Sequence, residues 1–195
     1  KHPNIIKVYG IFDGNEKTPP CILMEYCSNN LENVIVDKKL SAFDIAIIIY
    51  QIAEGIRFIH FKKVIHRDIK PRNILINEDK IIKICDFGIS KYMFGDETSL
   101  TGGVGTQKFM APEMINEEKN YTEKIDVYSF GVVIFYIITG QMPNISIGKI
   151  ASGKKAQIPK DVNDFARSLI NDCWNFDPKS RPSFAEICQR LKENN

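Results

Sequence analysis

The sequence predicts an α+β domain, with short strands confined to the first part of the chain and helices continuing to its end. Three observations support this. Apolar residues recur at helical spacing from Ser41 to Phe61, and a strongly apolar helical stretch follows from Tyr121 to Thr139. Short β-branched runs bounded by turn residues, such as Ile81 to Ile84, predict strands.

Turn and capping signals place the individual elements. A turn at His2-Pro3-Asn4 leads into the first strand, Ser41 is a suitable N-cap for the long helix, and Gly140 ends the apolar helix. Ser183 and Glu186 form a capping-box pattern that starts the final helix. The expected strands are at 8–9, 21–26, 64–65, 74–76 and 82–85. The expected helices are at 41–61, 121–139, 165–175 and 183–193, and the stretch from 147 to the helix at 165–175 is expected to be loop.

Composition predicts one globular domain, or most of one. The chain has 195 residues, of which 44% are hydrophobic and 26% charged, which is enough to bury one core. The formal net charge is +2 without a long basic block, so neither a nucleic acid nor an acidic membrane surface is expected as a partner.

Cysteine spacing and apolar run length indicate the compartment. The five cysteines include no Cys-x-x-Cys pair or zinc-type spacing with histidine, which predicts a reducing, cytoplasmic location. The longest apolar runs, Ile45 to Tyr50 and Val132 to Ile138, are shorter than the roughly 20 residues of a membrane span. We expect them to be buried helices and expect no membrane contact from this segment.

One short stretch carries the residue types that phosphoryl transfer requires. Asp68, Lys70 and Asn73 lie within a turn-like segment, and Asp86 follows a β-branched run. Phosphoryl transfer needs mainly positioning and charge neutralisation. A carboxylate such as Asp68 can accept the proton of an acceptor hydroxyl, Lys70 can hold the transferring phosphate, and Asn73 with Asp86 offers the oxygen ligands that Mg²⁺ prefers.

These residues belong to a series of motifs that resembles the protein kinase signature set. The motifs are, in order, His66-Arg67-Asp68-x-Lys70-x-x-Asn73, Asp86-Phe87-Gly88, Met110-Ala111-Pro112-Glu113, Asp126-Val127-Tyr128-Ser129-Phe130-Gly131 and Trp174-x-x-Asp177-Pro178-x-x-Arg181-Pro182. The resemblance covers nearly the whole chain. It implies a protein kinase-like fold, mostly the helical C-terminal lobe, with ATP and Mg²⁺ as cofactors and proteins as substrates.

The resemblance also implies roles for single residues. Asp68, Lys70, Asn73 and Asp86 would be catalytic, and Asn73 and Asp86 would also be the metal ligands. The residues expected to bind ATP are Met24, Glu25 and Cys27 around the adenine-binding hinge, Leu75 beneath the adenine ring, and Lys70, Asn73 and Asp86. Residues 1–26 would be a remnant of the N-terminal lobe and 27–195 the C-terminal lobe, with an activation segment at 86–113.

Further expectations concern the activation segment and its supports. Thr98, Ser99 and Thr101 are candidate phosphorylation sites. A solvated loop hydroxyl is the favoured interpretation for any single one of them, but we expect at least one to be modified. Thr106 resembles the threonine that bonds the catalytic Asp and Lys in Ser/Thr kinases. Gly103-Val104-Gly105 superficially resembles a glycine-rich phosphate-binding loop, but such a loop needs a glycine at position 108, which is Lys, and a strand before it. We therefore expect this stretch to be flexible hinge material. Asp126 would hold the His66-Arg67 backbone, and Arg181 would pair with Glu113.

Three parts of an intact kinase are missing from this sequence: the glycine-rich loop, the strand lysine and its helix glutamate. We therefore expect a kinase domain truncated at its N-terminus, which needs an upstream N-lobe for activity. Lys70 and Thr106 favour the Ser/Thr type, within the tyrosine-kinase-like group, whereas Arg72 and Cys173-Trp174 leave tyrosine specificity open. A catalytically inactive docking module is the alternative from another class.

Overall fold

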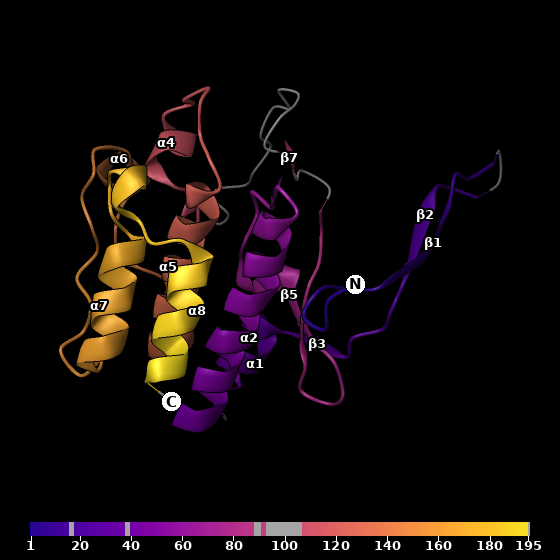
Figure 1. Ribbon diagram of the computed structural model, residues 1–195, viewed down its shortest axis with the longest axis horizontal. Helices are drawn as coiled ribbons and strands as arrows, with labels where there is room; N and C mark the ends of the chain where they lie inside the picture. Colours follow the sequence, from indigo (N-terminus) through magenta and orange to yellow (C-terminus); the bar gives the residue numbers. More distant parts are fainter. Residues whose placement is uncertain (16–17, 38–39, 88–90, 93–106, 195) are drawn as a thin grey trace.

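The computed structural model describes residues 1–15, 18–37, 40–87, 91–92 and 107–194. It has a body of packed helices with small antiparallel sheets at one side, and a two-stranded ribbon that extends away from that body (Figure 1). The predicted α+β class is therefore confirmed.

In the described part of the chain, the strands form three small sheets, and each pairing of two strands is antiparallel. β1 pairs with β2, β5 lies between β3 and β6, and β4 pairs with β7. The strands are β1 Val8–Phe12, β2 Cys21–Met24, β3 Asn29–Asn30, β4 Val64–Ile65, β5 Ile74–Ile76, β6 Ile82–Ile84 and β7 Lys91–Tyr92.

The helices build the core of the body (Figure 1). The α-helices are α1 Leu31–Val36, α2 Ala42–Phe61, α4 Pro112–Ile115, α5 Lys124–Thr139, α6 Ile147–Ala151, α7 Asp164–Cys173 and α8 Phe184–Glu193, and the short 3₁₀ helices are η1 Pro71–Asn73 and η2 Pro178–Ser180. Among the described residues, no helix is both long and apolar enough to cross a membrane.

Helix α2 begins and ends where its sequence predicts. Ser41 accepts a hydrogen bond from the Asp44 N–H, and the Asp44 carboxylate accepts one from the Ser41 N–H, so both halves of a capping box are present. Ile52 and Ile56 are fully buried on its core face. The same reciprocal capping starts α8 at Ser183.

Helix α5 is buried on nearly all sides and forms the centre of the body. It begins at Lys124, three residues later than expected, because Tyr121 to Glu123 lie in a turn whose bonds are local. It ends at Gly140, whose φ of 67° is the left-handed conformation that glycine adopts most readily. A Cβ at Gly131 would lie 2.7 Å from Cys173 Cβ, so this glycine allows α5 to lie close to the end of α7.

Two further expectations need correction. The stretch from Ile147 was expected to be loop, but it contains α6, which is too short for a periodic pattern to reveal. The second strand was expected to reach Tyr26, but β2 ends at Met24 because Glu25 bonds back to Lys7 outside the β1–β2 ladder.

The β1–β2 ribbon exposes apolar side chains on both faces. Ile11 is 72% exposed on β1 and Leu23 is 64% exposed on β2. A two-stranded ribbon is marginal by itself, because stability in water usually requires a third strand or a helix packed on one face. All five cysteines of the chain are free, in agreement with the absence of disulfide spacing.

Candidate active site

The His66-Arg67 turn that carries the candidate catalytic residues is attached to helix α5 by one buried carboxylate. Asp126 accepts hydrogen bonds from the backbone N–H of His66, at 2.8 Å, and of Arg67, at 2.9 Å. Arg67 has a φ of 73°, a backbone conformation that residues other than glycine rarely adopt. The two hydrogen bonds that Asp126 accepts therefore stabilise a strained backbone immediately before Asp68. The contact of Asp126 with the His66-Arg67 backbone is the one that the family resemblance implied.

Asp126 is also bonded by a residue that sequence reasoning missed. His60 Nε2, in the last turn of α2, lies 2.8 Å from Asp126 Oδ2. Burial would raise the pKa of Asp126, but the hydrogen bond and charge of His60, together with the His66 contacts, hold that pKa below its ordinary value. His60 lies in the last turn of the long apolar helix, and only the three-dimensional contact marks it as part of the site.

The predicted residues Asp68, Lys70 and Asn73 converge on one carboxylate oxygen. Lys70 Nζ lies 2.6 Å and Asn73 Nδ2 lies 2.8 Å from Asp68 Oδ2. Asn73 Nδ2 also donates to the Asp68 carbonyl at 2.9 Å. Among the described residues, nothing donates a hydrogen bond to Asp68 Oδ1, so one face of this carboxylate is oriented by its neighbours and the other is open.

Asp86 is brought next to this cluster by the end of β6. The N–H of Cys85 donates to the Asn73 carbonyl at 3.0 Å, and the His66 ring nitrogen Nε2 lies 2.9 Å from the Cys85 carbonyl. Asp86 has a φ of 63° and is exposed, while the Phe87 ring packs on His66 with ring centres 4.9 Å apart. Burial raises the pKa of the Cys85 thiol to about 11, so it stays protonated beside the cluster.

Asn73 and Asp86 offer oxygen atoms of the kind that bind magnesium. Asn73 donates through Nδ2, which leaves its Oδ1 as a free ligand atom among the described contacts, and Asp86 supplies an exposed carboxylate. Magnesium is commonly bound by one or two carboxylates and keeps several waters, so few protein ligands suffice. The described residues contain no group of three or more His, Cys, Asp or Glu that could hold a metal by themselves.

The residues expected at the nucleotide base lie in two places. Glu25 is bonded to the body, because its carboxylate lies 3.1 Å from Lys83 Nζ in β6, and Lys83 is the strand partner of Leu75. Met24 lies on the exposed ribbon, opposite Val8. Burial and the nearby Glu25 charge raise the pKa of the Cys27 thiol. The described structure thus brings Glu25 and Leu75 to one sheet and leaves Met24 outside the body.

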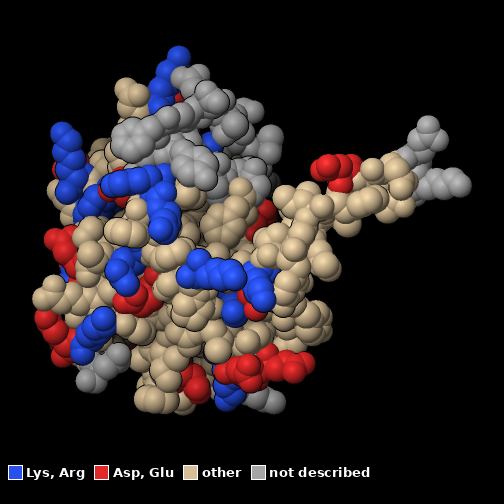
Figure 2. Space-filling model, turned by 45° about the vertical axis from the view of Figure 1, so that its right-hand side comes forward, with Lys and Arg blue, Asp and Glu red and all other residues tan. Residues whose placement is uncertain are grey.

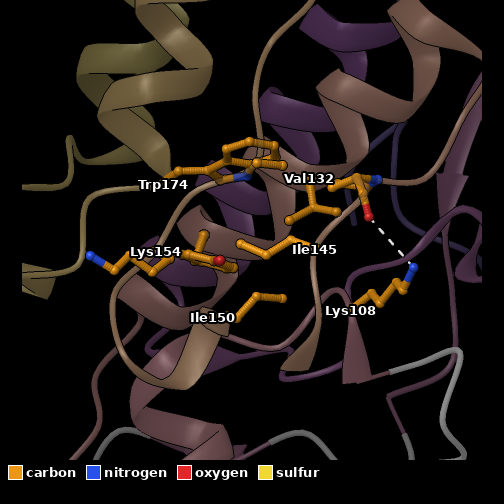
Figure 3. A pocket seen from close by; sticks show the side chains of 9 residues that line it. Lys108, Val132, Ile145, Ile150, Lys154 and Trp174 are labelled. Carbon is orange, nitrogen blue, oxygen red and sulfur yellow. Dashed lines mark hydrogen bonds between the residues drawn. The ribbon is translucent and has the colours of Figure 1, made fainter. Parts of the chain in front are cut away.

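The segment from Gln107 to Glu113 is held against α5 and α6. Ser129 Oγ donates to the Phe109 carbonyl at 2.7 Å, and Lys108 Nζ reaches the Pro143 carbonyl at 3.5 Å. Beneath it lies a small pocket (Figure 3), in which the stems of Lys108 and Lys154 line opposite sides and both ammonium groups point away from the centre. The pocket is lined by Lys108, Tyr128, Val132, Pro143, Ile145, Ile150, Lys154, Ala156 and Trp174.

The predicted pair of Glu113 and Arg181 is present and buried. Arg181 Nη1 and Nη2 lie 2.6 Å and 2.8 Å from the two Glu113 oxygens, a bidentate arrangement. Arg181 also donates to backbone carbonyls, among them that of Asn175 at 2.7 Å. This pair joins the start of α4 to the loop before α8 and fixes the end of the Gln107–Glu113 segment.

Several expected site residues lie outside the described residues. They are Gly88, Thr98, Ser99, Thr101, Gly103, Val104, Gly105 and Thr106. Their expected roles remain predictions.

The charged side chains are unevenly distributed on the face of the molecule that Figure 2 displays. Lys and Arg side chains gather toward the upper left of this view.

Comparisons with known proteins define the class. The family model described as protein kinase domain matches residues 1–191. The chain belongs to this family, whose members use ATP and typically Mg²⁺.

Of three individual relatives, two are named as serine/threonine kinases, and one of these two is also named for tyrosine. Mitogen-activated protein kinase kinase kinase 12 of Rattus norvegicus is 34% identical over 98% of this chain and 22% of its own length. Serine/threonine-protein kinase STY17 of Arabidopsis thaliana is 29% identical over 99% of this chain and 35% of its own length. Serine/threonine/tyrosine-protein kinase HT1 of Arabidopsis thaliana is 33% identical over 98% of this chain and 51% of its own length.

The resemblance to Ser/Thr kinases of the tyrosine-kinase-like group is thereby confirmed. This chain spans between about a fifth and a half of the length of these three relatives.

Proposed function

We propose that this domain transfers the γ-phosphoryl group of ATP to Ser or Thr hydroxyls of proteins, in the cytoplasm, once an upstream segment supplies the glycine-rich loop and the strand lysine. The observation that carries the proposal is the convergence of Lys70 and Asn73 on one oxygen of Asp68. A helical docking module would gain nothing from orienting a carboxylate in this way. The five free cysteines support the reducing compartment.

The proposed roles follow from the contacts. The open oxygen of Asp68 orients the acceptor hydroxyl and takes its proton as the new O–P bond forms. Lys70, which pairs with Asp68, would balance the negative charge of this carboxylate and of the incoming phosphate. When bound, ATP with Mg²⁺ would supply the γ-phosphoryl group, with ADP as the leaving group. Asn73 and Asp86 would hold the metal through Asn73 Oδ1 and the Asp86 carboxylate.

The nucleotide contacts are proposed on the same basis. Leu75 would form the floor beneath the adenine ring, and the backbone from Glu25 to Cys27 would bind its edge, with Met24 behind the pocket. The Glu25–Lys83 ion pair supports this, because it attaches the proposed hinge to the strand that leads to Asp86. We also propose residues 1–26 and 27–195 as parts of two lobes, with the activation segment at 86–113.

Phosphate transfer from labelled Mg-ATP to generic Ser/Thr proteins tests the proposal. The comparison includes this chain, a version extended upstream, and the extended version with Asp86→Asn or Asp68→Asn. We expect transfer only by the extended chain, with both substitutions reducing it at least about 100-fold. Phosphoamino-acid analysis of the product separates Ser and Thr from Tyr acceptors. An extended chain that transfers no phosphate would favour the docking module.

A further inference from the structure

Arg72 lies on the rim of the candidate active site and has no part in the proposed chemistry. It occupies the middle of η1, directly before Asn73, and is two residues from Lys70. Its Nε donates to Glu32 Oε2 at 2.7 Å across 40 residues of sequence. The Arg72 side chain is 72% exposed and that of Glu32 is 35% exposed.

The backbone beneath Arg72 is rigid. Pro71 and Asn73, its neighbours in η1, are both buried, and Asn73 is fixed to Asp68. Glu32 is in the first turn of α1, which packs on η1. Burial raises the pKa of Tyr136 in α5, the charge of Glu32 raises it further, and the charge of Arg72 lowers it. Both charges of the pair therefore act on Tyr136. The backbone of Arg72 is therefore held beside the catalytic candidates, while its side chain extends toward solvent.

The guanidinium group is only partly used by this pair. Among the described contacts, Glu32 engages Nε alone, and the two terminal nitrogens have no acceptor. Exposed ion pairs of this kind contribute only about 0–1 kcal/mol, so a competing ligand can share or displace Glu32 at low cost. Because Glu32 is the less exposed partner, the charge presented to solvent beside Asp68 is positive.

The free fork of an arginine has a defined ligand. Its parallel N–H groups match the two oxygens of a carboxylate or of a phosphate, and such bidentate contacts combine strength with geometric selectivity. A lysine at the same place would act only as a point charge. Arg72 is the neighbour of Asn73, which bonds to Asp68, so a residue that flanks an acceptor hydroxyl at Asp68 can come within reach of the guanidinium group.

We propose that Arg72 is a specificity-determining residue that binds an oxyanion side chain, either Asp or Glu or a phosphorylated residue, next to the acceptor hydroxyl of the protein substrate. This inference rests on the proposed kinase function. Glu32 pairs with the guanidinium group while no substrate is bound, and the incoming oxyanion shares or replaces it.

The competing explanation is that the pair only ties α1 to η1. A simple tether is lost equally when either partner is changed. Oxyanion recognition requires Arg72 but not Glu32, so the two explanations differ in the behaviour of Glu32→Gln. This substitution keeps the shape of the side chain and removes its charge, and it is the matched control for Arg72→Gln.

The test uses the upstream-extended chain and a set of Ser peptides. The peptides differ only in one residue, which is Ala, Asp, phosphoserine or Arg, placed in turn at each position around the acceptor. We expect kcat/KM for the best Asp or phosphoserine peptide to exceed that for the Ala peptide by about tenfold, a difference of about 1.4 kcal/mol. The Asp and phosphoserine arms show which source of the oxyanion is preferred.

The variants decide the assignment. Arg72→Gln should remove the preference, because KM for the acidic peptides rises while kcat on the Ala peptide changes little. Arg72→Glu should favour the Arg peptide. Glu32→Gln should retain the acidic preference. The inference is overturned if the wild type shows no acidic preference, if the preference survives Arg72→Gln, or if Glu32→Gln loses it equally. In each of these cases, transfer to the Ala peptide still upholds the kinase function. Failure of the wild type to phosphorylate any peptide overturns both.

Discussion

The carboxylate of Asp126 accepts a hydrogen bond of 2.8 Å from the backbone N–H of His66, 60 residues earlier in the chain. The same carboxylate bonds Arg67 N–H and His60. One buried side chain of α5 thus holds both the end of α2 and the turn before Asp68. This relationship explains how a strained, non-glycine turn is maintained at the candidate active site.

Replacing Asp126 should destabilise the domain and disorganise the site. Asp126→Asn keeps the volume but turns one accepting oxygen into a donor that faces the backbone N–H groups. We expect a loss of about 3 kcal/mol in the free energy of unfolding. Urea denaturation measures it, with Asp161→Asn, an exposed carboxylate without a hydrogen bond among the described contacts, as the control. A loss below that of the control variant would contradict the assigned role.

Asp126 should also contribute to acid sensitivity. Its pKa in the folded state lies below the ordinary value of 3.8, so the carboxylate stabilises the fold fully above that value. This stabilisation is lost as the pH falls through the folded pKa. The stability difference between the wild type and Asp126→Asn should therefore be constant from about pH 7 to pH 5 and shrink below about pH 4. Urea titrations across this range would reveal a different window if another group dominates.

The buried pair of Arg181 and Glu113 should be costly to break from one side. Arg181→Met leaves the Glu113 carboxylate buried without its cation, and we expect a loss of about 3–5 kcal/mol. The double substitution Arg181→Met with Glu113→Leu should cost less than Arg181→Met alone, because no charge is left unpaired. Thermal and urea unfolding of the three variants measure this. Equal losses in the single and double variants would mean that the carbonyl contacts of Arg181 matter more than its ion pair.

Asn73 should affect both the geometry of Asp68 and the use of metal. Asn73→Ala removes two hydrogen bonds to Asp68 and one proposed Mg²⁺ ligand. We expect kcat of the upstream-extended chain to fall by about 100-fold or more and half-maximal activity to require more Mg²⁺. Steady-state kinetics over a Mg²⁺ titration check this, with Asn171→Ala, an exposed residue of α7, as control. A lower kcat with an unchanged Mg²⁺ requirement would leave Asn73 only its positioning role.

Gly131 should be intolerant of a side chain because of the close approach of α5 to α7. An added Cβ would lie 2.7 Å from Cys173 Cβ and 2.8 Å from Trp174 Cδ1. We expect Gly131→Ala to cost about 1–3 kcal/mol. Trp174 is the only tryptophan of the chain, so its fluorescence should also shift. Gly148→Ala, which meets no atom within 4 Å, is the matched control and should be neutral or slightly stabilising.

Local patterns were sufficient for much of the fold. The apolar spacing of α2, its Ser41 cap, the Gly140 stop and the capping box of α8 are all interactions within a few residues, so they can be read along the chain. Short elements were missed for the same reason. α6 has five residues and shows no periodic pattern, and α1 and α4 are equally brief.

The sequence by itself determined the class of this protein, because ordered motifs name the residue types that phosphoryl transfer needs. Only the tertiary structure decided how those residues meet. The family resemblance had implied the contacts of Asp126 with His66 and of Arg181 with Glu113. The contacts of Asp126 with His60 and of Arg72 with Glu32, which join residues 66 and 40 positions apart, appear only in the folded chain. Such contacts depend on how helices pack around a shared core, and no pattern along one segment encodes where another segment will lie.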